Sequence, residues 1–349
     1  MFKNLKGFRD FYPEEFAKLN HLFRVFRQVA RNYGFQEYNV PILEPLDLYV
    51  EKSGEEIVDQ LFAFEDKGKR QVALRPEITP SLARLIGAKA NSLKLPVKWF
   101  NIGECFRYER QQKGRTRSFY QFNADIFGES GCYADAELLN LLIDILRGLG
   151  LGSNDFKVRF SDRELWVAYL GGKGLSETDI YKVLAVVDKS ERESKEWAIN
   201  SIESFLTGQG ASLCEEIDEL KSISDLGELE AFFKSKGDVS ETLKNRLEDW
   251  KTLLGCLKAS GTIDFIKIDL GIVRGLAYYT GFVYEAFETT GKNRALAGGG
   301  RYNNLVPKLS NVKEMPAAGF AIGDVTLQDC LSERGLLTNY IFKSDFYVV

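Results

Sequence analysis

The chain has 349 residues, a formal net charge of −4, 44% hydrophobic residues and 28% charged residues, which is ordinary for a globular enzyme. The acidic balance argues against a protein that coats nucleic acid, and no apolar run reaches the roughly eighteen residues that a membrane span needs. The five cysteines are scattered without a C-x-x-C pair. We therefore expect neither a disulfide framework nor a zinc site, and the cytoplasm is the simplest compartment. The single histidine, His21, lies in a helical pattern and is interpreted as structural, which leaves histidine-based catalytic triads without a base.

The first half of the chain alternates between helical and strand patterns. In chain order we predict a helix over 13–33 and a strand over 35–40, then a strand that breaks into a helix over 71–80. Two strands over 97–128 and a helix over 135–149 follow. Pro13 suits the first turn of the first helix, because a missing N–H costs nothing there. Pro41 and Pro45 follow the first strand and indicate an edge or an interface, since proline cannot donate to a central ladder.

The second half begins with a helical stretch over 171–260. Two Ser-x-x-acid patterns, Ser176 to Asp179 and Ser190 to Glu193, are typical of capping boxes at helix starts. Strand patterns return after this stretch, over 263–269, 281–288 and 317–322. A run of three glycines, 298–300, separates them. Runs of strands with helices at their ends predict an α+β fold around an antiparallel sheet, flanked by helices and carrying a helical insertion.

Residues 106–125 hold the densest group of polar side chains, with four arginines, a glycine loop and a Gln/Asp pair. In a strand-loop-strand hairpin, Gln121 and Asp125 share a face because strand side chains alternate with a period of two. Arg107 would lie on the other arm near the same floor. Fixed positive charge beside a polar pocket suits a small anionic molecule that also forms hydrogen bonds. By spacing alone, a basic hairpin with solvated charges fits equally well.

Taken together, these pieces resemble the class II aminoacyl-tRNA synthetases, and within them the histidyl-tRNA synthetase family, over nearly the whole chain. The helix and strand that end at Pro41 resemble motif 1, which builds a homodimer interface in that family. Residues 106–128 resemble motif 2, and 272–281 (IVRGLAYYTG) resemble the histidine-specific signature. Residues 298–302 (GGGRY) match the glycine-rich floor that follows it.

The resemblance implies a cytoplasmic histidine–tRNA ligase that uses L-histidine, ATP and Mg²⁺ to make histidyl-adenylate and then charges tRNA(His). Negative charge crowds at one phosphorus during activation, so the protein must supply positioning and fixed positive charge rather than a histidine base. Arg107 and Arg274 match the family's two catalytic arginines. No protein side chain is assignable as a metal ligand, and no membrane partner is expected.

The same resemblance implies the residues that contact each substrate. Glu77, Thr79 and Gln121 match positions that hold the α-amino group, and Asp125 and Tyr279 match those that bind the two imidazole nitrogens. The full histidine-binding set is Glu77, Ile78, Thr79, Arg107, Gln121, Asp125, Arg274, Tyr278 and Tyr279. The ATP-binding set is Arg107, Glu109 and Arg115.

Two positions depart from the family pattern. Ala277 replaces an aspartate in the signature, and Thr326 stands where motif 3 carries an arginine that packs on adenine and contacts the γ-phosphate. Either ATP binding is weaker here or another arginine substitutes. The departure keeps an alternative open: a non-catalytic paralogue, the regulatory subunit of ATP phosphoribosyltransferase in histidine biosynthesis. The intact set of binding residues and catalytic arginines favours the enzyme.

The expected organisation places the helical insertion within a divided catalytic core. The first part of the core, with motifs 1 and 2, spans 1–170, the insertion spans 171–260, and the second part of the core spans 261–340. Residues 341–349 are expected to start an anticodon-binding domain that is otherwise missing.

Overall fold

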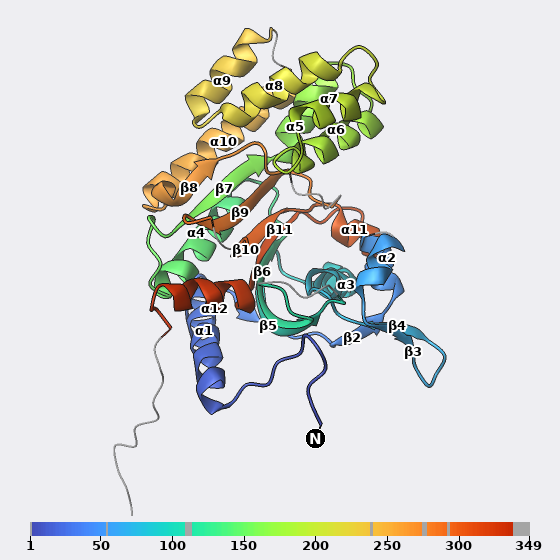
Figure 1. Ribbon diagram of the computed structural model, residues 1–349, viewed down its shortest axis with the longest axis vertical. Helices are drawn as coiled ribbons and strands as arrows, with labels where there is room; N and C mark the ends of the chain where they lie inside the picture. Colours follow the sequence, from blue (N-terminus) through green and yellow to red (C-terminus); the bar gives the residue numbers. More distant parts are fainter. Residues whose placement is uncertain are drawn as a thin grey trace, which may run out of the picture.

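An eight-stranded sheet forms the centre of the computed structural model, with helices on both faces and a helical lobe at one end (Figure 1). The structure describes residues 2–53, 55–108, 114–237, 240–273, 278–291 and 294–337. The predicted α+β fold class is confirmed. The segment 341–349, expected to start a further domain, lies outside the described residues.

The secondary structure is as follows. The α-helices are α1 Pro13–Asn32, α2 Asp47–Ser53, α3 Thr79–Lys89, α4 Tyr133–Gly148, α5 Arg163–Gly172, α6 Glu177–Lys189, α7 Lys195–Glu203, α8 Gly210–Ser222, α9 Leu226–Ser235, α10 Glu241–Ala259, α11 Leu305–Leu309 and α12 Asp324–Glu333. The 3₁₀ helices are η1 Glu55–Gln60, η2 Ala90–Ser92 and η3 Ile263–Phe265. The strands are β1 Gln36–Glu37, β2 Leu43–Pro45, β3 Ala63–Glu65, β4 Gln71–Leu74, β5 Val97–Phe106, β6 Ser118–Phe127, β7 Phe156–Asp162, β8 Ile266–Ile268, β9 Phe282–Glu288, β10 Ala297–Arg301 and β11 Ala317–Gly323.

The large sheet has the order β1-β5-β6-β11-β10-β9-β7-β8. Its interior pairs are antiparallel, as predicted, and the two edge pairs, β1 with β5 and β7 with β8, are parallel. The strand predicted over 35–40 shrinks to the two residues of β1 at the edge. The glycine run 298–300 does not separate strands: it lies inside β10 and pairs with β9 and β11 on either side.

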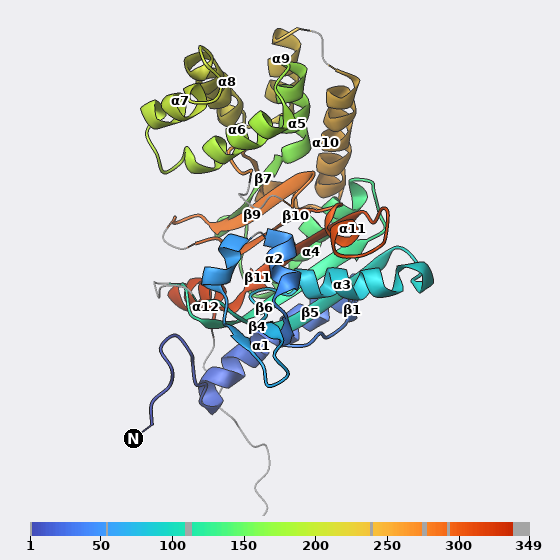
Figure 2. The same ribbon diagram turned by 90° about the vertical axis from the view of Figure 1, so that its right-hand side faces the viewer.

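The two faces of the sheet carry different residues. Phe122, Ala124 and Ile126 of β6 are buried in the main core, to which α1 and α4 contribute. The opposite face carries Gln121 and Asp125, and a smaller core beside it joins α3, α11 and the β9–β10 region (Figure 2). Strand alternation therefore supplies an apolar face for the core and a polar face for a site.

Helices α5 to α10 form the helical lobe, drawn in green to gold in Figure 1. The predicted cap at Ser176 is confirmed, because its hydroxyl accepts a hydrogen bond from the Asp179 amide at 3.2 Å. The second predicted cap is wrong: Ser190 follows the end of α6, and Ser194 caps α7 through the Trp197 amide at 3.1 Å. Among the described residues, no helix is both long and apolar enough to cross a membrane.

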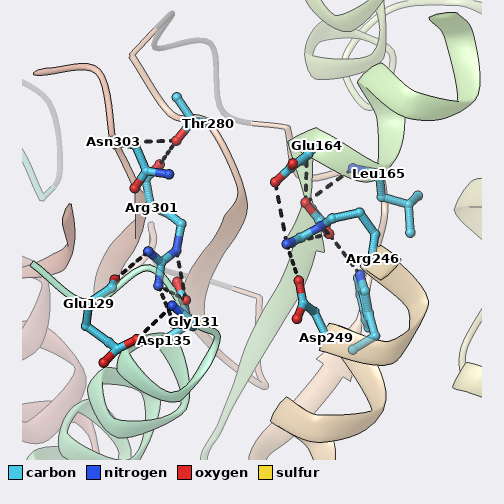
Figure 3. Close-up of polar contacts among 12 residues, drawn as sticks. Glu129, Gly131, Asp135, Glu164, Leu165, Arg246, Asp249, Thr280, Arg301 and Asn303 are labelled. Atoms are coloured by element: carbon cyan, nitrogen blue, oxygen red, sulfur yellow. Dashed lines mark hydrogen bonds and ion pairs between the residues drawn. The ribbon is translucent and has the colours of Figure 1, made fainter. Parts of the chain in front are cut away.

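Buried arginine–aspartate pairs join the lobe and the helices to the sheet (Figure 3). Arg246 of α10 donates from Nε and Nη2 to Asp162 Oδ2 at 2.9 and 2.6 Å, while Asp162 Oδ1 caps α5. Arg301 of β10 donates to Asp135 Oδ2 of α4 at 3.0 and 2.5 Å. Such pairs have demanding geometry, so they fix the lobe and α4 relative to the sheet.

Candidate active site

The polar face of the sheet has a floor almost without side chains. In the strand register, Asp125 of β6 lies opposite Gly319 of β11, and Gly319 lies opposite Gly300 of β10. A Cβ at Gly319 would lie 2.0 Å from Asp125 Oδ1, and one at Gly300 would lie 2.9 Å from the Tyr279 ring. Glycine is therefore required at both positions if these two polar side chains are to lie over the sheet.

A cavity of about 110 Å³ lies on this floor and collects most of the predicted histidine-binding residues. The described residues that line it are Glu77, Thr79, Arg107, Gln121, Asn123, Asp125, Tyr278, Tyr279, Gly298, Tyr302, Gly319, Phe320 and Ala321. We call it the histidine cavity hereafter, after the ligand predicted from the sequence. Residues far apart in the chain meet here because β6, β10 and β11 are neighbours and Tyr278 and Tyr279 line the cavity above them.

Asp125 is the most unusual group in this cavity. Its side chain is 1% exposed, and its Oδ1 accepts a short hydrogen bond from the Tyr302 hydroxyl. Its Oδ2 has no hydrogen-bond partner among the described residues. Burial raises the pKa of this carboxyl to about 7, although the Tyr302 hydrogen bond lowers it. An unpaired buried carboxylate oxygen is costly, and a ligand N–H would satisfy it.

The polar side chains beside Asp125 hold one another in place. Gln121 donates from Nε2 to Asn123 Oδ1 at 2.7 Å, and Asn123 donates from Nδ2 to Thr79 Oγ1 at 3.4 Å. Thr79 is the first residue of α3, so the start of this helix is tied to β6. The chain of hydrogen bonds fixes the orientation of the Gln121 amide at the cavity wall.

Tyrosine rings form another part of the cavity wall. Tyr278 and Tyr279 stack with ring centroids 4.4 Å apart, and Tyr278 meets Tyr302 edge-on at 5.8 Å. A flat aromatic ligand would find ring surfaces here in addition to the Asp125 carboxylate.

Arg107 lines both this cavity and a larger one of about 860 Å³. Its Nε donates to the Pro76 carbonyl at 3.0 Å, and its guanidinium lies 5.2 Å from the Phe119 ring centroid. The described residues that line the larger cavity are Arg107, Gly114, Arg115, Thr116, Phe119, Arg192, Glu285, Phe287, Arg294, Ala295, Gly323, Val325 and Thr326. We call it the arginine cavity, because its described lining holds four arginines and one acid, Glu285.

Three predicted site residues are placed differently or not described. Arg274 of the signature and Glu109 of motif 2 lie outside the described residues. Ile78 does not line the histidine cavity: its side chain is fully buried and packs with Val40 and Cys105. Its position before α3 explains this, because the next residue, Thr79, takes the place that faces the cavity.

Several lining residues escaped the sequence reading. Asn123 lies between Gln121 and Asp125, and the same period of two would have found it. Tyr302 directly follows the glycine-rich strand but gives no local signal of its contact with Asp125, 177 residues away. Arg192 and Arg294 come from the helical lobe and the β9–β10 connection, and reach the arginine cavity only through the tertiary fold.

The chemistry that the residues allow is polar and electrostatic. Among the described residues, no group of three or more His, Cys, Asp or Glu side chains could hold a metal ion. Glu285 is the one carboxylate among the described lining residues of the arginine cavity. Mg²⁺ commonly binds through one or two carboxylates together with substrate phosphates, so this donor set fits a metal that arrives with a nucleotide.

Comparisons with known proteins identify the family to which the chain is similar. The family model described as histidyl-tRNA synthetase matches residues 7–326. A protein named histidine–tRNA ligase from Opitutus terrae is 52% identical over 348 residues, covering 100% of this chain and 79% of that protein. Another of that name from Leptospira biflexa is 38% identical, covering 99% and 78%. A solved structure from Bacillus halodurans, described as an ATP phosphoribosyltransferase regulatory subunit/histidyl-tRNA synthetase, has a TM-score of 0.81 at 24% identity, covering 95% and 83%.

Proposed function

This chain belongs to the histidyl-tRNA synthetase family and is a histidine–tRNA ligase, and we propose that its two cavities divide the reaction between them. The histidine cavity binds the amino acid, the arginine cavity binds ATP, and Arg107 acts where they meet.

The observation that carries the amino-acid assignment is the unpaired Oδ2 of buried Asp125. An imidazole N–H satisfies this oxygen, whereas an apolar side chain of similar size leaves it unpaired, and a site built in this way rejects the wrong ligand strongly. The second imidazole nitrogen faces the tyrosine wall, where we place Tyr279. The family resemblance assigned the same two roles from the sequence.

The backbone groups of histidine need partners of opposite sign. We place the α-amino group against Glu77, Thr79 and Gln121, which line the histidine cavity. The carboxylate then points to Arg107, whose guanidinium is shared with the arginine cavity. A guanidinium suits this position because it can contact a carboxylate and a phosphate at once.

Activation then proceeds at Arg107. A carboxylate oxygen of histidine attacks the α-phosphorus of ATP, the bond from this phosphorus to the bridging oxygen of the β-phosphate breaks, and pyrophosphate leaves from the arginine cavity. Arg107 stabilises the charge on the α-phosphate, Arg115 contacts the distal phosphates, and no proton needs to move. Mg²⁺, held by the phosphates and Glu285, would neutralise phosphate charge. Arg274 and Glu109 remain proposed contributors.

In the second half-reaction, a hydroxyl oxygen of the terminal ribose of tRNA(His) attacks the carbonyl carbon of histidyl-adenylate, and AMP leaves. The hydroxyl proton is transferred to the departing phosphate or to solvent. We further propose a cytoplasmic homodimer. Free cysteines at all five positions support a reducing compartment. Ile42 and Leu43, more than 40% exposed, support an interface near motif 1.

No specific observation favours the alternative function, a regulatory subunit of ATP phosphoribosyltransferase. Its support is a fold likeness at 24% identity, and the fold is shared by both classes of protein. The relatives at 52% and 38% identity are both named as ligases.

Histidine-dependent ATP–pyrophosphate exchange tests the proposal directly. We expect exchange with histidine and none with the other amino acids. Arg274→Ala should keep histidine binding by calorimetry but lose exchange, since it removes charge rather than the pocket. Histidine binding without exchange in the unaltered protein would contradict the assignment of ATP to the arginine cavity.

A further inference from the structure

The position of Thr326 raises the question of which group supplies positive charge at the start of α12. Thr326 is neutral and lies in the first turn of this helix, at the edge of the arginine cavity. Gly114, in the turn that precedes Arg115, borders the same spot: a Cβ there would lie 3.5 Å from Thr326 Oγ1 and 3.9 Å from Arg294 Cδ. Gly114 has φ +76°, which favours glycine, so this close approach belongs to the turn itself.

Arg294 comes from the connection between β9 and β10, well before α12 in the chain. Its side chain therefore lies beside the position of Thr326 although it starts from another element. The two side chains border one turn of the motif 2 loop, so a guanidinium at 294 reaches the region that a longer basic side chain at 326 would reach.

The part of ATP that meets Arg294 follows from where the reaction occurs. Arg107 lines both cavities, so the α-phosphorus must lie beside it. Of the two cavities, Arg294 lines the arginine cavity and not the histidine cavity. The base and ribose are neutral, whereas the β- and γ-phosphates carry the remaining negative charge and require cations in a site of low dielectric.

We propose that Arg294 binds the distal phosphates of ATP and replaces, from the β9–β10 connection, the charge that Thr326 lacks. The inference rests on the proposed assignment of ATP to the arginine cavity. It adds a residue that the sequence reading missed, and it makes the neutral residue at 326 compatible with an active enzyme.

Calorimetric titration of the full chain with ATP, ADP and AMP tests the inference. We expect Arg294→Ala to weaken ATP binding by about tenfold or more, since a charge-assisted contact is lost, and to leave AMP and histidine binding within about twofold. Arg294→Lys, which keeps one charge, should retain most of the ATP affinity. Arg147→Ala, at the exposed end of α4 and away from both cavities, is the matched control for loss of one arginine.

A second substitution asks whether positions 294 and 326 serve the same phosphates. In the Arg294→Ala background, Thr326→Arg should recover ATP affinity, because the new guanidinium starts beside the same turn. Equal weakening of ATP and AMP would overturn the inference in favour of a contact with the adenosine part, and unchanged ATP binding would overturn it outright. Histidine-dependent exchange by the unaltered protein is measured in parallel, so a failure of the proposed function is seen separately.

Discussion

Replacing Asp125 by asparagine should weaken histidine binding and, in the same variant, stabilise the fold. Asparagine keeps the volume, and its side-chain oxygen can still accept the Tyr302 hydroxyl. With that oxygen facing Tyr302, the side-chain NH2 group takes the place of Oδ2, so a donor replaces the charged acceptor for an imidazole N–H. A hydrogen bond to a charged group contributes about 1.5–3 kcal/mol, so the Kd for histidine should rise roughly tenfold to a hundredfold.

The stability gain follows from the pKa of Asp125, which burial raises from 3.8 to about 7. A carboxyl with a raised folded-state pKa stabilises the fold at low pH and loses that contribution as the pH rises from about 4 to about 7. At about 1.36 kcal/mol per unit, the raised pKa costs the fold roughly 4 kcal/mol at pH 8, where the folded carboxyl is ionised. At pH 5 the cost falls to roughly 1.5 kcal/mol, because the folded carboxyl takes up a proton that the unfolded chain mostly lacks. Asparagine removes this cost, so its advantage should be larger at pH 8 than at pH 5 by roughly 3 kcal/mol.

Urea denaturation at both pH values, with histidine titrations by calorimetry, measures the two effects. Asp135→Asn is the matched control, because this buried aspartate is paired with Arg301 and its loss should destabilise the fold by about 3–5 kcal/mol without a specific effect on histidine. An Asp125→Asn variant that binds histidine normally would refute the role of Oδ2. Equal changes in stability at pH 5 and pH 8 would refute the raised pKa.

The same residue predicts how histidine binding depends on pH. Affinity in the unaltered protein should increase as the pH rises through about 7, because Asp125 must lose its proton to accept an N–H. The imidazole of the ligand titrates near 6.5 as well. The Asp125→Asn variant separates the two groups: whatever dependence it retains belongs to the ligand, and identical profiles for both proteins would exclude Asp125 as the titrating group.

Three further substitutions test the floor, the shared arginine and the lobe. Gly319→Ala should abolish histidine binding in calorimetry, because its Cβ would lie 2.0 Å from Asp125 Oδ1. The control is Gly255→Ala in α10, whose Cβ would meet nothing within 4 Å and which should stabilise that helix by about 1 kcal/mol. Arg107→Ala should lower the exchange rate by about 10²- to 10³-fold while the melting temperature stays within a degree or so, since it removes charge stabilisation at the α-phosphate. Arg246→Met should lower the stability by about 3–5 kcal/mol in urea, because it leaves the buried carboxylate of its partner uncompensated; a smaller loss would mean that apolar packing replaces the pair.

Local periodicity predicted the polar face of the site, because a strand places every second residue on one side. Gln121 and Asp125 were found in this way, and the structure puts both on the floor with Arg107 nearby. The Ser-x-x-acid rule for helix starts failed at the second cap. Ser190 has Glu193 three residues on but follows α6, whereas Ser194, which has Trp197 at that place, caps α7. The glycine strand was missed because glycine has low strand propensity and pairs here for reasons of space.

Contacts between distant segments could not be predicted from spacing. Gly319 is required by the side chain of Asp125, which lies opposite it only once β6 and β11 are in register. Tyr302 and Arg294 depend in the same way on β10 lying beside β11. Sequence patterns identify which face is polar, but the size of a cavity depends on which small residues face which large ones across strands.

The buried aspartates show how the fold separates stability from recognition. Asp135 and Asp162 each accept hydrogen bonds from two nitrogens of one arginine, and each pair fixes a helix to the sheet. Asp125 is equally buried, yet the described residues give it only the neutral hydroxyl of Tyr302. Pairing it with an arginine would stabilise the carboxylate and occupy the oxygen that a ligand needs. The raised pKa of Asp125 thus reflects the stability that the fold loses by keeping an acceptor available for the ligand. Recognition of histidine and stability of the fold therefore favour different arrangements at this residue.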